Sequence, residues 1–575
     1  MELSPDTIDS VIHPTAAFLP HDAARSHPAV GSITDTPSPS WEMSHLNPKN
    51  RVDSLSPLSE PLFRIDGSTA FGSQFYAVPV FMDPLPPLRI DVFIPELSTQ
   101  PRHIRDILEL DRAFHTKDRT RVAHLAISKH IQRRLQLWTK TLDQPGDYLG
   151  SLPFGSRIVF KNMALDIRQI EIEIGPAHAL ETFLFSEAQF RETWGPDIHL
   201  PPAIDISQVQ FLEQIHDSTC LVRVDGVYHI LKALTSFSKY LYHELKMLLT
   251  MKPHPNVMSS PVHIVTKQVK FGAKRAVIGF TLEYHEHGTM RDIVPLLGSS
   301  GALTSTEQFK WALQIASGLT HLRETSGNFY PDLRLDNIVL SSKRDAIMVD
   351  FEQRGVWCEF AAPEVNAVEY IRMIATGENV PEDVREKFAD RMETLCPGYE
   401  DLLSREKYTN PPGGYNVSWL SLNPAEQEAA EVYMLGRVLW CLFEGVSAPQ
   451  KATIWISYRW ESPLQFPAYR RTPEAIRRLI DSCTKGRRPT LDTTVVRQGS
   501  RLVLSGQDPS EATREAVLDV ARTWWTKEVR WAEDYLDMRQ SQMASGQWNY
   551  NPYDRPKLRE VLQQLKTIKA DMGVI

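Results

Sequence analysis

The chain has 575 residues and a mass of 65.5 kDa, which leaves room for three or four folded units with a large apolar core. Its net charge of −8 and its pI near 6.2 argue against general nucleic-acid binding. Five scattered cysteines without a CxxC pair exclude a zinc knuckle and indicate a reducing compartment.

The first 60 residues are rich in Ser, Pro, Asp and Thr and poor in aromatic residues. This composition predicts a disordered, solvated tail over residues 1–60, in which the Thr-Pro and Ser-Pro pairs at 36–39 are candidate phosphorylation sites. The acidic start lacks the apolar run of a signal peptide. The apolar segment 432–446 is too short to span a bilayer and contains two charges. We therefore expect an intracellular protein, cytoplasmic or nuclear, with no membrane contact.

Residues 61–205 alternate strand-like and helical segments. The strand-like segments lie at 75–81, 88–93 and 170–174, and an amphipathic helical stretch lies at 102–137. No motif of recognisable chemistry occurs here. This region is either an extension that packs on the next unit or a separate interaction module.

A predicted strand and helix open the next unit. Residues 227–233 alternate and are rich in β-branched side chains, so they predict a strand that carries Lys232 near its end. Residues 240–248 have helical spacing and contain Glu244, twelve positions after Lys232. Either residue alone is typical of a solvated surface, so a joint role depends on the motifs that follow.

Two acids and an amide follow at a rare spacing. Asp332 lies in the run Tyr-Pro-Asp-Leu-Arg-Leu-Asp-Asn, which ends at Asn337, and Asp350 begins Asp-Phe-Glu after an apolar strand. Carboxylate and amide oxygens are hard ligands that suit Mg²⁺. Arg334 adds a permanent positive charge between them. Each residue alone can also shape a turn or cap a strand.

Taken in order, these segments resemble the eukaryotic protein kinases, whose usual motifs are HRDLKxxN and DFG. The resemblance extends to His-Pro-Asn-Val at 254–257, a hinge-like segment at 282–288, a helix at 314–319 and Ala-Pro-Glu at 362–364. It covers about residues 207–490. The variants YPDLRLDN and DFEQRG look like those of divergent kinase-like proteins of filamentous fungi.

The resemblance implies an α+β, bilobal protein-kinase-like fold. A small β-rich lobe would span residues 207–285, and a large α-helical lobe would span 286–575 with an insertion at about 365–430. The N-terminal α/β extension at 61–205 and the tail at 1–60 would precede it.

The resemblance also implies ATP and Mg²⁺ as cofactors. Lys232, held by Glu244, would grip the α- and β-phosphates. Asn337 and Asp350 would bind Mg²⁺ through oxygen. Asp332 would accept the proton of the substrate hydroxyl.

Four further residues take roles only from the resemblance. Arg334 stands where the family has a lysine and would contact the γ-phosphate. Val222 would cover the adenine ring. Glu283 and His285 lie on the hinge, where their backbone would hold the adenine.

Several positions depart from the family pattern. Ile215, Asp217 and Cys220 stand where the glycine-rich loop would have glycines, so the backbone cannot close as tightly over phosphates. Glu352 replaces the glycine of DFG. We therefore expect ATP to bind weakly.

The segment from Asp350 to Glu364 has fifteen residues and no Ser, Thr or Tyr, so phosphorylation cannot switch it. The insertion at 365–430 is a candidate to partner, cover or replace the substrate platform. Glu364 needs an arginine partner. Arg488 and Arg555 both precede a proline and compete for this place, and we favour Arg488.

We expect an ATP/Mg²⁺-dependent phosphotransferase, a divergent serine/threonine protein kinase that transfers the γ-phosphate to a protein hydroxyl. The alternative is a pseudokinase that acts as a scaffold or allosteric regulator, and a small-molecule kinase is a third reading. The expected partners are a protein substrate and a regulatory protein for the N-terminal extension or the insertion, with no nucleic acid.

Overall fold

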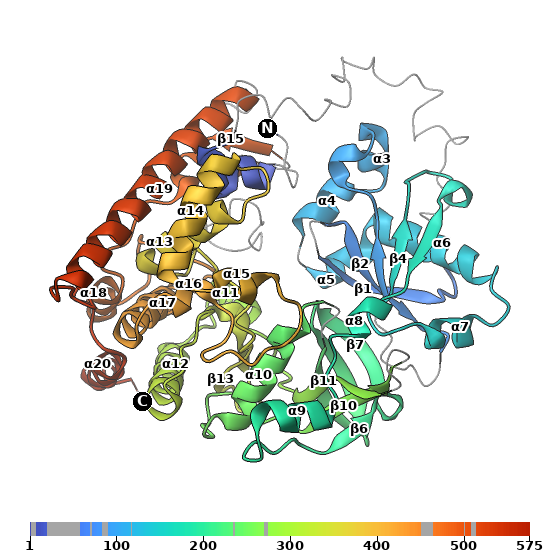
Figure 1. The fold of residues 1–575 in the computed structure, drawn as a ribbon, viewed down its shortest axis with the longest axis horizontal. Coiled ribbons are helices and arrows are strands. Elements are labelled where there is room, and N and C mark those ends of the chain that lie inside the picture. Colours follow the sequence, from blue (N-terminus) through green and yellow to red (C-terminus); the bar gives the residue numbers. More distant parts are fainter. Residues whose placement is uncertain are drawn as a thin grey trace.

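The computed structural model describes residues 1, 7–19, 58–69, 72–82, 90–116, 118–233, 236–269, 274–449, 464–498, 501–507 and 513–574. Over these ranges the chain is mixed α and β, with separate sheets and many helices (Figure 1). This architecture is compatible with a bilobal kinase-like fold. Within the same ranges, no helix combines the length and the apolar character needed to cross a membrane.

The N-terminal unit, residues 58–175, is built on a five-stranded sheet. Its apolar core also includes Leu491, Val495, Leu502 and Val517 from the C-terminal part of the chain. Its strands run in the order β1-β2-β3-β4-β5, namely Phe63–Thr69, Gln74–Pro79, Ile90–Phe93, Arg157–Phe160 and Ile172–Gly175. Between β3 and β4, which are parallel, the chain forms α3 Arg102–Ile107, α4 Leu110–His115, α5 Arg119–His124, α6 Ala126–Thr139 and α7 Pro145–Ser151. The helical stretch predicted at 102–137 is thus four short helices rather than one.

A six-stranded sheet follows, in the order β6-β10-β11-β9-β8-β7. Its strands are β6 Ala203–Asp205, β7 Gln210–His216, β8 Thr219–Val224, β9 Val227–Ala233, β10 His263–Gln268 and β11 Arg275–Glu283. Helix α10, Ser238–Thr250, buries Leu241, Leu245 and Leu248 at helical spacing in the same apolar core as the sheet. Two short helices, α8 His178–Glu181 and α9 Glu187–Trp194, connect the two sheets along the chain.

The two sheets meet at their edge strands, β1 and β7 (Figure 1). A carboxylate oxygen of Asp66 on β1 accepts the backbone N–H of Gln214 on β7 at 2.8 Å. The guanidinium of Arg64 donates to the carbonyl of Leu212 at 2.6 Å. Side chains of β1 therefore satisfy backbone groups that an edge strand otherwise leaves open.

The remaining helices form a helical part, residues 290–571, around the nearly fully buried α17. Its elements are α11 Met290–Ser300, α12 Ser305–Ser326, β12 Ile338–Leu340, β13 Ala346–Met348, α13 Pro363–Ala375, α14 Glu382–Leu395, α15 Tyr399–Ser404, α16 Val417–Leu420, α17 Pro424–Glu444, α18 Glu474–Cys483, β14 Val495–Gln498, β15 Arg501–Leu504, α19 Arg514–Ala544 and α20 Leu558–Asp571. Helix α17 begins with a capping box between Asn423 and Glu426. Helix α19 runs along the edge of the molecule, next to β14 and β15 (Figure 1).

Residues 7–19 differ from the disordered tail predicted for 1–60. They form short helical turns at Ile8–Ile12 and Pro14–Ala17 that pack against α13 and α19. The indole of Trp525 donates to the carbonyl of Val11 at 2.8 Å. Buried Ile8 and Val11 explain the difference, because two apolar residues in a polar stretch suffice to dock a turn. Residues 20–57, with the Thr-Pro and Ser-Pro pairs, lie outside the described residues.

Residues 405–416, here called the strap, are the part of the insertion that contacts helices α9 and α10 beside the six-stranded sheet. Asn410 accepts from the ammonium of Lys246 on α10 at 2.6 Å and donates to the carbonyl of Thr193 at 3.1 Å. The hydroxyl of Tyr408 accepts from the indole of Trp194 at 3.0 Å. The strap therefore ties α9 and α10 to the helical part.

Candidate functional site

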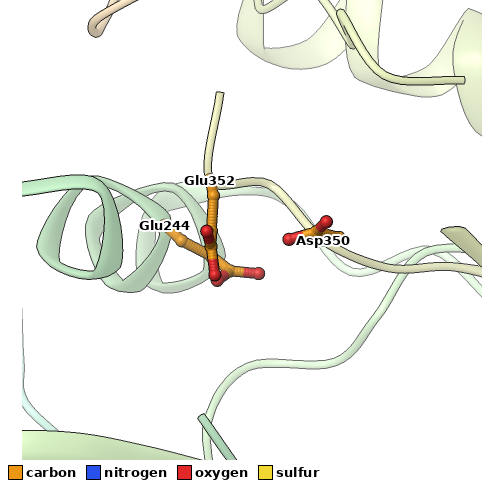
Figure 2. A group of neighbouring side chains, drawn as sticks. All are labelled: Glu244, Asp350 and Glu352. Carbon is orange, nitrogen blue, oxygen red and sulfur yellow. The ribbon is translucent and has the colours of Figure 1, made fainter. Parts of the chain in front are cut away.

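Lys232 near the end of β9 lies at the centre of three carboxylates. Its Nζ is 2.7 Å from Glu244 on α10, 2.8 Å from Asp350 and 3.1 Å from Glu352. Figure 2 shows Glu244 and Glu352 reaching toward the same place, with Asp350 beside them. The three carboxylates lie within 4.8 Å of one another. In this structure their central cation is the lysine.

The charges in this group set one another's pKa. Burial acts to lower the pKa of Lys232, but the carboxylates of Asp350, Glu244 and Glu352 outweigh it and raise that pKa. Burial acts to raise the pKa of Asp350, but the ammonium of Lys232 outweighs it and lowers that pKa. Burial raises the pKa of Glu244 against the pull of Lys232. The lysine and Asp350 are therefore held as a charged pair.

Glu244 also fixes the chain beyond β13. Its second carboxylate oxygen accepts the backbone N–H of Phe351 at 3.0 Å. Asp350 itself has φ +66° and Gln353 has φ +57°, a left-handed conformation that non-glycine residues rarely adopt. Strained backbone of this kind is maintained where the surroundings determine it, and it is frequent at functional sites.

Asp332 and Asn337 form one hydrogen-bonded loop between α12 and β12. The amide of Asn337 donates to the carbonyl of Asp332 at 3.0 Å and to its carboxylate at 2.8 Å. Arg334 lies 2.9 Å from the same carboxylate and stacks over Trp357 at 4.6 Å. Burial and the charge of Asp350 raise the pKa of Asp332, although Arg334 opposes them. A partly buried carboxylate with a raised pKa is suited to proton transfer.

Tyr330 supports this loop in a way that the sequence did not reveal. Its hydroxyl donates to the carbonyl of Val349 and lies 3.4 Å from that of Asn337. Its ring packs against Phe351 at 5.1 Å, and its backbone N–H donates to Glu431 at 2.7 Å. The buried tyrosine thus joins the Asp332 loop to Asp350. In the sequence, the feature that could have indicated this role is an aromatic residue directly before Pro331.

The structure places Val222 on the face of the sheet opposite Lys232. In the β8–β9 register, Val222 pairs with His229, whereas Leu221 pairs with Ile230 and Thr219 with Lys232. Directly paired residues of antiparallel strands lie on the same face, and neighbours along a strand lie on opposite faces. Leu221 therefore shares a face with Lys232, and Val222 points to the other face.

The hinge-like residues follow the end of β11. Glu283 is the last residue of that strand and is exposed, while His285 lies in the link to α11. Burial lowers the pKa of His285, and Glu283 opposes this effect.

At the β7–β8 turn, Asp217 lies 3.5 Å from Arg354, so the turn that lacks glycines contacts the segment after Asp350.

The arginine that pairs with Glu364 is Arg555, not Arg488. Arg555 is buried and donates to both carboxylate oxygens of Glu364, one at 3.1 Å, and to the carbonyl of Ala429 at 3.0 Å. Arg488 instead pairs with Glu528 on α19 at 2.7 Å and stacks over Trp531. The long α19 supplies a nearer carboxylate to Arg488, which leaves Glu364 to Arg555.

Comparison with known proteins gives a distant relationship. No protein-family model matches the chain. It is similar to Serine/threonine-protein kinase 12 of Arabidopsis thaliana, with 24% identity over 296 residues. The match covers 46% of this chain, which spans about three fifths of the length of that relative. At the coarse level, this similarity supports a protein-kinase-like enzyme.

Proposed function

We propose that the protein is an ATP- and Mg²⁺-dependent phosphotransferase that phosphorylates serine or threonine hydroxyls of proteins. In this proposal the fold is bilobal, with the six-stranded sheet and α10 as the small lobe and the helical part as the large lobe. The observation that carries the proposal is the Lys232–Glu244 ion pair in direct contact with Asp350.

Each residue has a task that its surroundings support. Glu244 holds the Lys232 ammonium in place, so the ammonium can contact the α- and β-phosphates of ATP. The oxygens of Asp350 and Asn337 are of the hard type that Mg²⁺ requires. When bound, Mg²⁺ neutralises phosphate charge. Asp332 takes the proton of the attacking hydroxyl as its oxygen bonds to the γ-phosphorus and the bond to ADP breaks.

Arg334 supports the loop in this proposal. It neutralises Asp332 and is fixed by Trp357, so its guanidinium is already engaged. If Arg334 also contacted a γ-phosphate, its guanidinium would have to be shared between that phosphate and Asp332. We therefore assign Arg334 first to holding Asp332 in position.

A pseudokinase scaffold is the second candidate, and one observation favours it. Glu352 adds a third carboxylate to Lys232, where a polyanionic nucleotide would have to bind. Nucleotide binding separates the two candidates.

Thermal unfolding with and without millimolar MgATP tests the proposal. Stabilisation follows the ratio of ligand concentration to Kd and reaches about 2.7 kcal/mol at a hundredfold excess. We expect MgATP to raise the Tm of the wild type but not that of Asp350→Asn, which lacks an anionic oxygen ligand. Asp383→Asn, on the exposed side of α14, is the control and keeps the wild-type shift. An unchanged wild-type Tm would reject the enzyme and favour the scaffold.

A further inference from the structure

The Lys232 ammonium contacts three carboxylates. It forms hydrogen bonds to Glu244 and Asp350, and an oxygen of Glu352 lies 3.1 Å away as a third contact. A lysine ammonium has three N–H donors and no acceptor. Three acidic side chains therefore surround the group that, under the proposed function, binds phosphate.

Glu352 depends on Lys232 for its counter-charge. The residue is 6% exposed, and a buried carboxylate is costly unless a cation lies close to it. A second cation is near: the Nε of Arg354 lies 3.7 Å from the other oxygen of Glu352, and the Arg354 side chain is 39% exposed. Glu352 can thus leave Lys232 for Arg354 without losing a cationic partner.

We infer that Glu352 is an intramolecular competitor of the nucleotide phosphates for Lys232. Its carboxylate lies in ion-pair contact with the ammonium and turns toward Arg354 when a phosphate group replaces it. This inference rests on the proposed function and deepens it, because it names the residue that opposes nucleotide entry. Asp350 and Glu244 stay in place, since each also has a separate role in the site.

The competition acts on phosphate and not on the adenosine part of the ligand. Three carboxylates surround Lys232, and Arg354 lies only at the far oxygen of Glu352, so negative charge is in excess at the place where phosphates bind. Like charges at short range repel strongly in a buried site. Removal of the Glu352 charge takes away one ion-pair partner of the ammonium and one repulsive charge. Both effects favour ATP and ADP and leave adenosine unaffected.

Isothermal titration calorimetry of the full chain with MgATP, and separately with adenosine, tests the inference. We expect Glu352→Gln, which keeps the shape but not the charge, to bind MgATP at least about tenfold more tightly than the wild type. Glu352→Gly should show the same direction, and adenosine affinity should not change. Glu386→Gln removes a carboxylate from the exposed surface of α14 and should match the wild type for both ligands.

The outcomes separate this inference from the proposed function. Tighter MgATP binding by Glu352→Gln than by the wild type, with equal adenosine binding, supports the inference. Equal MgATP affinity in the wild type and both Glu352 variants overturns the inference and leaves the proposed function standing. Absence of MgATP binding in every folded variant, with the fold checked by Tm, overturns both.

Discussion

Charge at the Lys232 site is balanced by contacts between oppositely charged side chains. The Lys232 and Glu244 side chains are almost fully buried, so their attraction is strong and each depends on the other for its ionisation. Loss of one partner leaves a buried charge unpaired, which typically costs about 3–5 kcal/mol. At the scale of single residues, the site is therefore a set of mutually dependent charges with Lys232 at its centre.

A buried histidine makes the stability of the N-terminal unit depend on pH. Burial lowers the pKa of His130 to about 4, although its ring hydrogen-bonds to the carbonyl of Ala164 at 2.9 Å. An unfolded histidine titrates near pH 6.5. Because the folded pKa is the lower one, this stability is complete above about pH 6.5 and is lost as the pH falls toward about 4.

We therefore expect His130 to reduce the free energy of unfolding by on the order of 2 kcal/mol between pH 7 and pH 5. His130→Gln keeps a donor for Ala164 but does not titrate, so its unfolding free energy should fall less over this interval. Chemical denaturation at the two pH values measures this, with the exposed His103→Gln as the control. An equal loss in His130→Gln and the wild type would contradict the assignment.

Residue identities predicted which side chains meet, but not how each is oriented. Lys232, Glu244 and Asp350 come together as their spacing and family resemblance indicate. Val222 lies on the face opposite Lys232, because in a strand a shift of one position reverses the face. The face follows from the β8–β9 hairpin, in which Val224 pairs with Val227 across the two-residue Asp225-Gly226 turn, so counting back from this turn would have placed Leu221 on the Lys232 face.

At the scale of elements, α10 is held from two sides. Its apolar face packs in the core of the six-stranded sheet, and its polar residues bind the end of α15 and the strap. Lys239 donates to the carbonyls of Leu402 and Leu403 at 2.6 and 2.8 Å. On the other side of the strap, Asn416 donates to the carbonyl of Gly355 at 2.8 Å. The strap thus fixes both the helix of Glu244 and the segment after Asp350.

Loss of the contact between α10 and the strap should loosen the helix. Lys246→Met keeps the apolar stem of the side chain but removes the donor to Asn410. A hydrogen bond contributes about 1 kcal/mol, so amides of residues 238–250 should exchange about fivefold faster. Hydrogen–deuterium exchange measures the effect, and the exposed Lys252→Met is the control. Unchanged protection of α10 would show that the strap does not hold it.

Local pattern predicted elements better than it predicted their partners. The strand with Lys232 and the helix with Glu244 are observed as β9 and α10. The turns at residues 8–17 were not predicted, because their stability comes from packing on α13 and α19, which lie hundreds of residues away. The pairing of Arg488 with Glu528 depends on α19 in the same way.

At the scale of the whole molecule, the N-terminal unit touches both the six-stranded sheet and the helical part. Residues of β1 and α5 line a cavity of about 780 Å³ with Leu212 and Leu221 of the sheet and Asp292 of α11. An ion pair between Arg119 and Glu213 crosses from α5 to β7. The N-terminal unit therefore lies against both the six-stranded sheet and α11.

We expect the loss of Asp66 to weaken the contact between the N-terminal unit and the six-stranded sheet. Asp66→Ala removes the acceptor for the Gln214 N–H and the partner of Arg64, and leaving a buried donor unpaired costs about 1–3 kcal/mol. We expect limited proteolysis to cleave the link at residues 176–202 faster in this variant. Asp197→Ala, an exposed acid within that link, is the control. Wild-type cleavage rates in Asp66→Ala would contradict the docking role.

Phosphate transfer tests the central claim most directly. The wild type and Asp332→Asn are incubated with Mg²⁺, γ-labelled ATP and a degenerate library of serine and threonine peptides, and label on the peptides is counted. The account predicts transfer by the wild type and a loss of about 10²–10⁴-fold in Asp332→Asn, with MgATP affinity unchanged, because the asparagine cannot accept the proton. Wild-type transfer no greater than that of Asp332→Asn would contradict the account.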